Sequence, residues 1–188
     1  GLDSGKKVVP WIIENNEEEF FSLNLNSTEF SNTWGKKSGN SYFYICDGQL
    51  SFSDEIIVIP KGGKFKNGYA YARKDVDTED WFFPCHFFQD PVMPGSLGIE
   101  AIIQALQCVA IQKELGISFK NPRFSPVLSK VSWKYRGQII PKNKYMQLDV
   151  HVKKIDKKEQ TIILYADANL WREELRIYEI SDIVLGIE

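Results

Sequence analysis

The stretch that most constrains the fold runs from residue 96 to about residue 115, where a predicted helix is apolar almost all the way round. Ser96 can cap its start, and Gly116 stands where a left-handed C-terminal cap belongs. A helix without a polar face must be wrapped by other elements. Its apolar positions are Leu97, Ile99, Ala101, Ile102, Ile103, Ala105, Leu106, Cys108, Val109, Ala110 and Ile111.

Short β-prone runs flank this helix on both sides in the sequence. Residues 42–46, 56–59 and 68–76 precede it, and residues 127–137, 145–155, 161–170 and 175–185 follow it. Turn-forming residues separate most of these runs, which is typical of strands joined by tight connections. The sequence therefore predicts an α+β fold in which an antiparallel sheet wraps one long helix.

Length and composition predict one packed domain. The chain has 188 residues, of which 43% are hydrophobic and 13% aromatic. Residues 1–40 show no lasting period of 2 or 3.6, so we expect an irregular arm whose aromatic side chains dock on another part of the protein. The first residue is Gly1, which fits either excision from a longer polypeptide or removal of a tag, and the sequence leaves both open.

Charge and cysteine usage exclude several classes of function. A formal charge of −2 gives no strong field for nucleic acid phosphates. The three cysteines have no CxxC spacing, so neither a disulfide framework nor a zinc site is indicated. Without an apolar run of about 18 residues or a signal-like start, we expect a cytoplasmic protein that binds neither membrane nor nucleic acid.

Three polar residues share one stripe of the apolar helix. Glu100, Gln104 and Gln107 lie at positions i, i+4 and i+7. A carboxylate buried without a partner raises its pKa, so Glu100 could stay protonated and act as a general acid. The alternative is that Gln104, Arg123 or Arg136 satisfies Glu100 in a structural role, and spacing alone favours neither interpretation.

The two histidines have different surroundings. His151 alternates with Gln147, Asp149 and Lys153, which predicts the polar, solvent-facing side of a strand. His86 lies inside an aromatic and proline-rich loop that leads into the apolar helix, where a neutral imidazole can act as a base. A lone histidine in such a loop is structural about as often as it is catalytic.

The loop between His86 and Glu100 ends in Pro94 and Gly95 at the start of the helix. A glycine there lets a ligand approach the backbone, and the free N–H groups and positive dipole of a helix start suit an oxyanion. A candidate base, an oxyanion donor and a candidate acid thus fall within residues 86–100.

Residues 81–101, with the sequence WFFPCHFFQDPVMPGSLGIEA, closely resemble the active-site segment of the bacterial 3-hydroxydecanoyl thioester dehydratases. The resemblance extends over residues 50–188, because residues 134–141 and 166–186 also resemble strands of that family. It implies a hot-dog fold over residues 50–188 and leaves residues 1–49 as an N-terminal extension. The extension and the start at Gly1 also resemble a dehydratase domain of a polyunsaturated fatty acid or polyketide-type synthase.

The resemblance assigns a role to each site residue. His86 matches the family's base, Gly95 its backbone oxyanion donor and Glu100 its acid, with substrate contacts expected from Gln104, Pro94, Ser96 and Phe87. The branch that also isomerises double bonds typically has Asp in place of Glu100, so we expect dehydration alone. Paired hot-dogs share sites in this family, which implies that His86 faces the Glu100 of a partner, in a homodimer or with a neighbouring hot-dog.

The expected substrate is a (3R)-hydroxyacyl chain on the phosphopantetheine of an acyl carrier protein, with no further cofactor or metal and a trans-2-enoyl thioester as product. Candidates for docking the acidic carrier are Lys130, Lys134, Arg136, Lys142 and Lys144. Ala101, Ala105 and Val109 could line an acyl tunnel beside Trp133 and Tyr135, although a plain core role is favoured for most of them. Two alternatives stay open: a non-catalytic hot-dog that binds acyl chains or acts as a scaffold, and a hydratase acting on coenzyme A thioesters.

Overall fold

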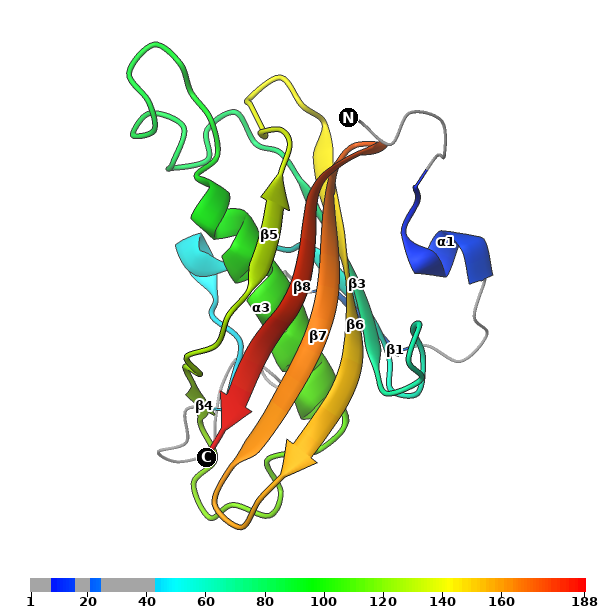
Figure 1. Ribbon diagram of the computed structural model, residues 1–188. Coiled ribbons are helices and arrows are strands. Elements are labelled where there is room, and N and C mark those ends of the chain that lie inside the picture. The colour runs from blue at the N-terminus through cyan, green and yellow to red at the C-terminus, as the bar shows by residue number, and fades with distance from the viewer. Residues whose placement is uncertain (1–7, 16–20, 25–42) are drawn as a thin grey trace.

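One long helix lies in the curve of an antiparallel sheet in the computed structural model, which describes residues 8–15, 21–24 and 43–188 (Figure 1). The helical elements are α1 (Trp11–Asn15), the 3-10 turn η1 (Gly48–Leu50) and α3 (Gly95–Gln112). The strands are β1 (Phe21–Asn24), β2 (Glu55–Ile59), β3 (Tyr69–Asp75), β4 (Phe124–Ser125), β5 (Ser132–Tyr135), β6 (Tyr145–Lys157), β7 (Ile162–Arg172) and β8 (Leu175–Ile187).

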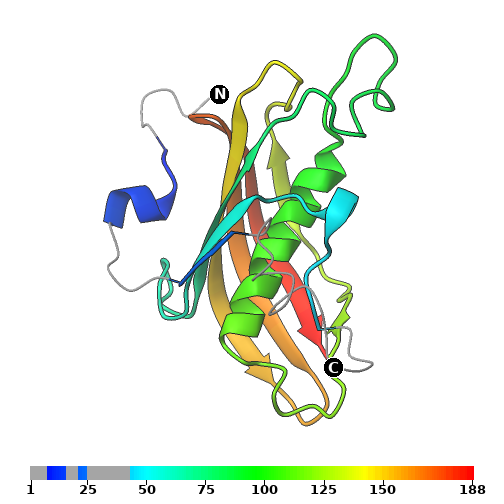
Figure 2. The ribbon, with the colours of Figure 1, turned by 180° about the vertical axis from the view of Figure 1, so that it is seen from behind.

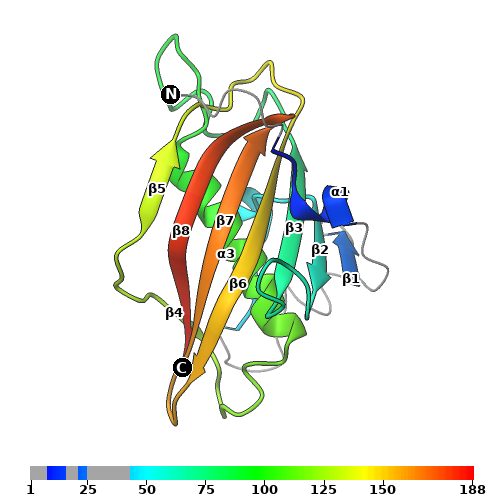
Figure 3. The ribbon, with the colours of Figure 1, turned by 45° about the vertical axis from the view of Figure 1, so that its right-hand side comes forward.

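The sheet has eight strands in the order β1-β2-β3-β6-β7-β8-β4, and β5 also pairs with β8 (Figure 3). Every pairing is antiparallel, and the long strands β6, β7 and β8 form a meander joined by tight turns. Seen from behind, α3 crosses the inner face of the sheet (Figure 2). The predicted α+β hot-dog architecture, a central helix wrapped by an antiparallel sheet, is confirmed.

Helix α3 forms because its apolar side chains on several faces find partners on β2, β3, β6, β7 and β8. Its buried residues are Gly98, Ala101, Ile102, Gln104, Ala105, Leu106, Cys108, Val109 and Ala110. It is long and apolar enough to pass a length-and-composition test for a membrane span, yet half of that window is buried inside the protein. The helix is therefore the core helix of the sheet.

Both predicted caps of α3 are wrong. Pro94 occupies the N-cap position without a side-chain hydrogen bond, and Ser96 lies inside the first turn. At the other end the left-handed residue is Glu114, with φ of 53°, and Gly116 does not have a positive φ. A glycine is needed at 116 for space, because a Cβ there would lie 2.9 Å from the ring of Phe43.

The strand predictions hold for the sheet interior and fail at its edges. The four runs from 56–59, 68–76, 145–155 and 161–170 are confirmed as β2, β3, β6 and β7, and the run from 175 as β8. The run 127–137 shortens to β5, and the described part of 42–46 is irregular. Ile45 is fully buried there and Phe43 stacks on Phe124 at 4.4 Å, so packing onto the core replaces strand pairing.

The N-terminal segment covers part of the outer face of the sheet, which makes the prediction of an exposed His151 wrong. His151 is 0% exposed, and its Nε2 lies 3.2 Å from Asp149 Oδ2. The backbone N–H of Trp11 donates to the same carboxylate oxygen at 3.1 Å, and the Trp11 ring packs on Tyr69 at 4.8 Å. Alternation placed His151 on the polar face correctly, but that face is not open to solvent.

Two described parts of the predicted N-terminal arm contact the sheet. Val8 accepts a hydrogen bond from the indole N–H of Trp171, and α1 lies on the face opposite α3 (Figure 1, Figure 3). Strand β1 pairs with β2 from Phe21 to Asn24. The rest of the arm lies outside the described residues.

Candidate active site

His86 is held by two hydrogen bonds to one residue. Its ring Nδ1 lies 3.0 Å from the carbonyl oxygen of Val92, and its own carbonyl accepts the Val92 N–H at 2.7 Å. Because a carbonyl oxygen can only accept, Nδ1 carries the proton in the neutral ring and Nε2 keeps its lone pair. The structure therefore presents His86 Nε2 as a base.

The loop that carries His86 is closed by backbone hydrogen bonds between Phe87 and Asp90, at 2.9 and 3.1 Å. The ring of Phe87 lies against the imidazole, with the ring centroids 3.9 Å apart, and is 58% exposed. An apolar side chain of this size beside a base is available to a substrate that enters from solvent.

The peptide group at the start of α3 follows the same loop. Met93 donates its N–H to Ile139 at 2.8 Å, Pro94 is extended, and Gly95 opens the helix. N–H groups in the first turn of a helix have no intrahelical partner, and the helix dipole favours negative charge there. Ser96 is exposed beside this position and Pro94 half-buried. The arrangement suits the oxygen of a polarised carbonyl.

Glu100 lies one turn further along α3 and pairs with Gln104. The Gln104 amide donates to Glu100 Oε1 at 3.1 Å and to the Leu50 carbonyl at 2.7 Å, while its oxygen accepts the Phe52 N–H at 3.1 Å. Gln104 is 0% exposed, so its contacts support holding the Glu100 carboxyl in place rather than touching a substrate. Of the three partners considered for Glu100, the structure shows Gln104, while Arg123 pairs with Glu188 and Arg136 with Glu179.

Cys46 is a neighbour of Glu100 that the sequence did not reveal. Burial raises the pKa of the Cys46 thiol, and the negative charges of Glu100 and then Asp47 raise it further. No spacing rule joins Cys46 to Glu100, because the segment that carries it is irregular.

Within one chain, His86 and Glu100 each make their hydrogen bond to a different residue, Val92 and Gln104. Among the described residues, no hydrogen bond or ion pair joins them, and no three His, Cys, Asp or Glu side chains converge as a metal site requires. Ala101, Ala105 and Val109 are fully buried, which agrees with the core role favoured for most of them over an acyl tunnel.

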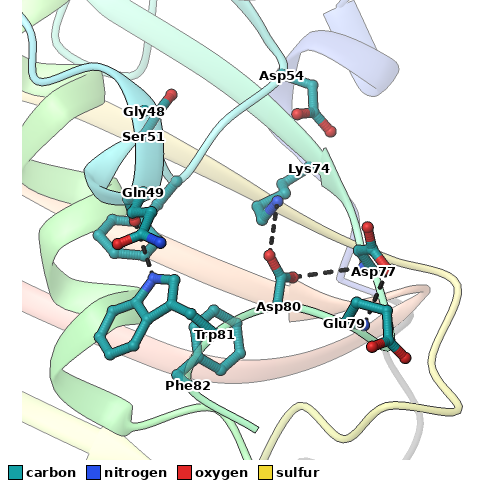
Figure 4. Close-up of a pocket in the computed structure, with 11 residues that line it drawn as sticks. Gly48, Gln49, Ser51, Asp54, Lys74, Asp77, Glu79, Asp80, Trp81 and Phe82 are labelled. Carbon is teal, nitrogen blue, oxygen red and sulfur yellow. Dashed lines mark hydrogen bonds and ion pairs between the residues drawn. The ribbon is translucent and has the colours of Figure 1, made fainter.

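Two cavities lie beside the candidate site, and neither is lined by His86, Gly95 or Glu100. The first, of about 460 Å³, lies between η1 and the loop after β3, where Lys74 pairs with Asp80 and the Trp81 indole N–H donates to Gln49 (Figure 4). The second, of about 360 Å³, is an apolar groove along one side of α3. Its lining residues are Ile99, Ile103, Val127, Ser129, Val131, Trp133, Ile183 and Val184.

Known proteins resemble this chain in sequence. The FabA-like domain family matches residues 45–181. One subunit of a polyunsaturated fatty acid synthase from Thraustochytrium sp. is 35% identical over 195 aligned residues, which cover 100% of this chain and 13% of that protein.

Solved structures overlap the fold in part. A conserved protein from Pseudomonas aeruginosa aligns with a TM-score of 0.42 at 9% identity, covering 64% of this chain and 81% of its own. A sigma28-regulated virulence protein from Campylobacter jejuni aligns with a TM-score of 0.41 at 9% identity, covering 63% of this chain and 68% of its own. The sequence match over residues 45–181, on a helix wrapped by an antiparallel sheet, shows that the chain belongs to the FabA-like hot-dog dehydratase family.

Proposed function

We propose that the chain removes water from (3R)-hydroxyacyl thioesters to give trans-2-enoyl thioesters. The observation that carries this proposal is the hydrogen bond from His86 Nδ1 to the Val92 carbonyl, which leaves Nε2 as a base just before the helix start at Gly95. A base beside an oxyanion site is what proton removal next to a thioester carbonyl requires.

The proposed reaction moves two protons and one hydroxyl group. His86 Nε2 takes the proton from the carbon next to the thioester carbonyl, and the carbonyl oxygen accepts the Gly95 N–H as negative charge develops on it. Protonated Glu100 gives its proton to the 3-hydroxyl, which leaves as water while the double bond forms. Return of the proton from the imidazolium to Glu100 through solvent restores the site, and no metal or redox cofactor is needed.

We further propose that each site combines His86 of one copy with Glu100 of a second copy. Two features support this: among the described residues, no hydrogen bond or ion pair joins the two side chains within one chain, and strand β5 offers an exposed edge. Trp133 and Tyr135 on β5 are 42% and 45% exposed, and these two residue types are enriched where one protein surface meets another. A neighbouring hot-dog of different sequence is the other possible partner.

The substrate carrier in this proposal is the phosphopantetheine arm of an acidic carrier protein. The 35% identity to a polyunsaturated fatty acid synthase subunit supports a role within such a multidomain synthase. Of the basic side chains suggested for docking, Lys130, Lys142 and Lys144 are at least partly exposed. Lys134 and Arg136 both pair with Glu179, which leaves positive charge in excess at that point.

The direct test is an assay with a 3-hydroxyacyl N-acetylcysteamine thioester, followed by mass spectrometry for the loss of one water. Wild-type turnover that His86→Ala abolishes supports the dehydratase. A well-folded wild-type protein that converts no substrate over several chain lengths, on N-acetylcysteamine, carrier protein and coenzyme A, contradicts it and favours an acyl-binding scaffold. Preference for hydrating enoyl coenzyme A would instead favour the hydratase.

A further inference from the structure

Three aromatic rings form a platform under the first turn of α3. Trp133 and Tyr135 come from β5 and Tyr178 from β8, and we call them the aromatic platform. The ring centroids of Trp133 and Tyr135 lie 5.3 and 5.1 Å from that of Tyr178, and 5.4 Å from each other. Strand pairing fixes this cluster, because Tyr135 lies opposite Tyr178 in the sheet register.

The helix start rests directly on this platform through two glycines. A Cβ at Gly95 would lie 3.1 Å from the Trp133 ring and 3.2 Å from the Tyr135 ring. A Cβ at Gly98 would lie 2.5 Å from the Tyr178 ring, closer than real side-chain contacts allow. Neither glycine has a positive φ, so their role is close approach and not backbone conformation.

The Tyr178 hydroxyl adds a polar contact to this packing. It lies 3.4 Å from the carbonyl oxygen of Gly95 and is placed to donate a long hydrogen bond to it. Burial raises the pKa of the Tyr178 hydroxyl, and the neighbouring Tyr135 raises it further. The phenol therefore keeps its proton at neutral pH. On the other side of Gly95, the Met93 N–H is fixed to Ile139 at 2.8 Å.

We propose that Tyr178 is a positioning residue: by holding the Gly95 carbonyl it fixes the backbone of Gly95, so that the Gly95 N–H, in the preceding peptide group, points at the thioester oxygen. This inference rests on the proposed dehydration, because it assigns Tyr178 to the oxyanion donor of that reaction. Tyr178 acts through Gly95 and is not itself a catalytic residue. Since an oxyanion contact is strongest in the transition state, its misplacement lowers kcat more than it changes KM.

The test compares Tyr178→Phe, which keeps the ring and removes the hydroxyl, with the wild type in the thioester assay. We expect kcat to fall about tenfold, given that a shift of about 1 Å in a catalytic group costs about a hundredfold, while KM stays within about twofold. The matched control is Tyr165→Phe on β7, whose ring lies under the Lys154 ammonium 4.3 Å away, and its kcat should equal that of the wild type.

A purely structural role gives a different pattern. Tyr178→Phe would then shift the urea midpoint of unfolding and leave kcat unchanged. This result overturns the positioning role of Tyr178, whereas turnover by the wild type still supports the proposed dehydration. A second variant, Gly98→Ala, pushes the helix start off the Tyr178 ring and should also lower kcat with little change in KM. Wild-type kcat in both variants would likewise overturn the positioning role, whereas a wild-type protein without turnover removes the reaction and this inference together.

Discussion

The Nδ1 atom of His86 lies 3.0 Å from the carbonyl oxygen of Val92, and this contact decides which nitrogen of the ring can take a proton. The Val92 N–H in turn donates to the His86 carbonyl at 2.7 Å, so ring and backbone are tied to the same residue. A hydrogen bond from one ring nitrogen to a carbonyl oxygen fixes the tautomer and the orientation of a histidine whose other nitrogen acts as a base.

Removing the base should stop the reaction without unfolding the protein. For His86→Ala we expect kcat to fall about a thousandfold, within the range for loss of a general base. The side chain is only partly buried in an exposed loop, so the free energy of unfolding should change by less than about 1 kcal/mol. Steady-state kinetics and urea unfolding of the same preparation check both statements, and a kcat within tenfold of wild type would contradict the role of His86.

Glu100 should tolerate a shorter acid better than a neutral isostere. Glu100→Gln keeps the shape but has no proton to give the leaving hydroxyl, so we expect kcat to fall at least about a hundredfold. Glu100→Asp keeps the acid and moves it back by one methylene, with an intermediate loss of up to about a hundredfold. Equal activity of Glu100→Gln and wild type in the thioester assay would exclude Glu100 as the acid.

Gln104 should matter for stability as well as for turnover. Gln104→Leu leaves the Leu50 carbonyl and the Phe52 N–H without their partner in the core, at about 1–3 kcal/mol for each unsatisfied group. The matched control is Gln107→Leu on the same stripe, where the side chain is half-buried, and we expect a change of less than about 1 kcal/mol. Urea unfolding measures both, and similar effects of the two changes would contradict the account of Gln104.

The thiol of Cys46 should respond to the charge of the neighbouring Asp47. Burial and the negative charge of Asp47 raise the thiol pKa, so Asp47→Asn removes one of these causes and lowers the pKa. A lower pKa means more thiolate at about pH 8 and faster alkylation by iodoacetamide, by about twofold or more. Peptide mass spectrometry resolves Cys46 from exposed Cys85, whose rate should not change. An unchanged Cys46 rate would contradict the assignment of Asp47 as a cause of the raised thiol pKa.

The sequence predicted the central helix and the long strands because hydrophobic periodicity determines them directly. Residues 96–111 are apolar on nearly every face, and α3 occupies Gly95–Gln112. The candidate site residues His86, Gly95 and Glu100 lie within 15 residues on one loop and one helix, so the sequence alone groups them, and their roles stay predictions.

Contacts between distant segments were not predictable. Alternation along β6 shows that Asp149 and His151 share a face, but not that Trp11, 138 residues before Asp149, covers it. The same limit applies to Gln104, whose partners Leu50 and Phe52 lie 54 and 52 residues earlier. A polar residue reads the same in the sequence whether its side chain contacts water or is covered by a distant segment, so the sequence does not distinguish these two cases.

Mixing two inactive variants tests the central claim most directly. His86→Ala chains keep Glu100, and Glu100→Gln chains keep His86, so a dimer of one of each has one complete site if each site draws from both copies. After unfolding and refolding an equal mixture, about half of the dimers are mixed, and turnover should return to about a quarter of the wild-type value. Near wild-type turnover by either variant alone would contradict the dehydratase mechanism, and a mixture as inactive as its parts would contradict the shared site.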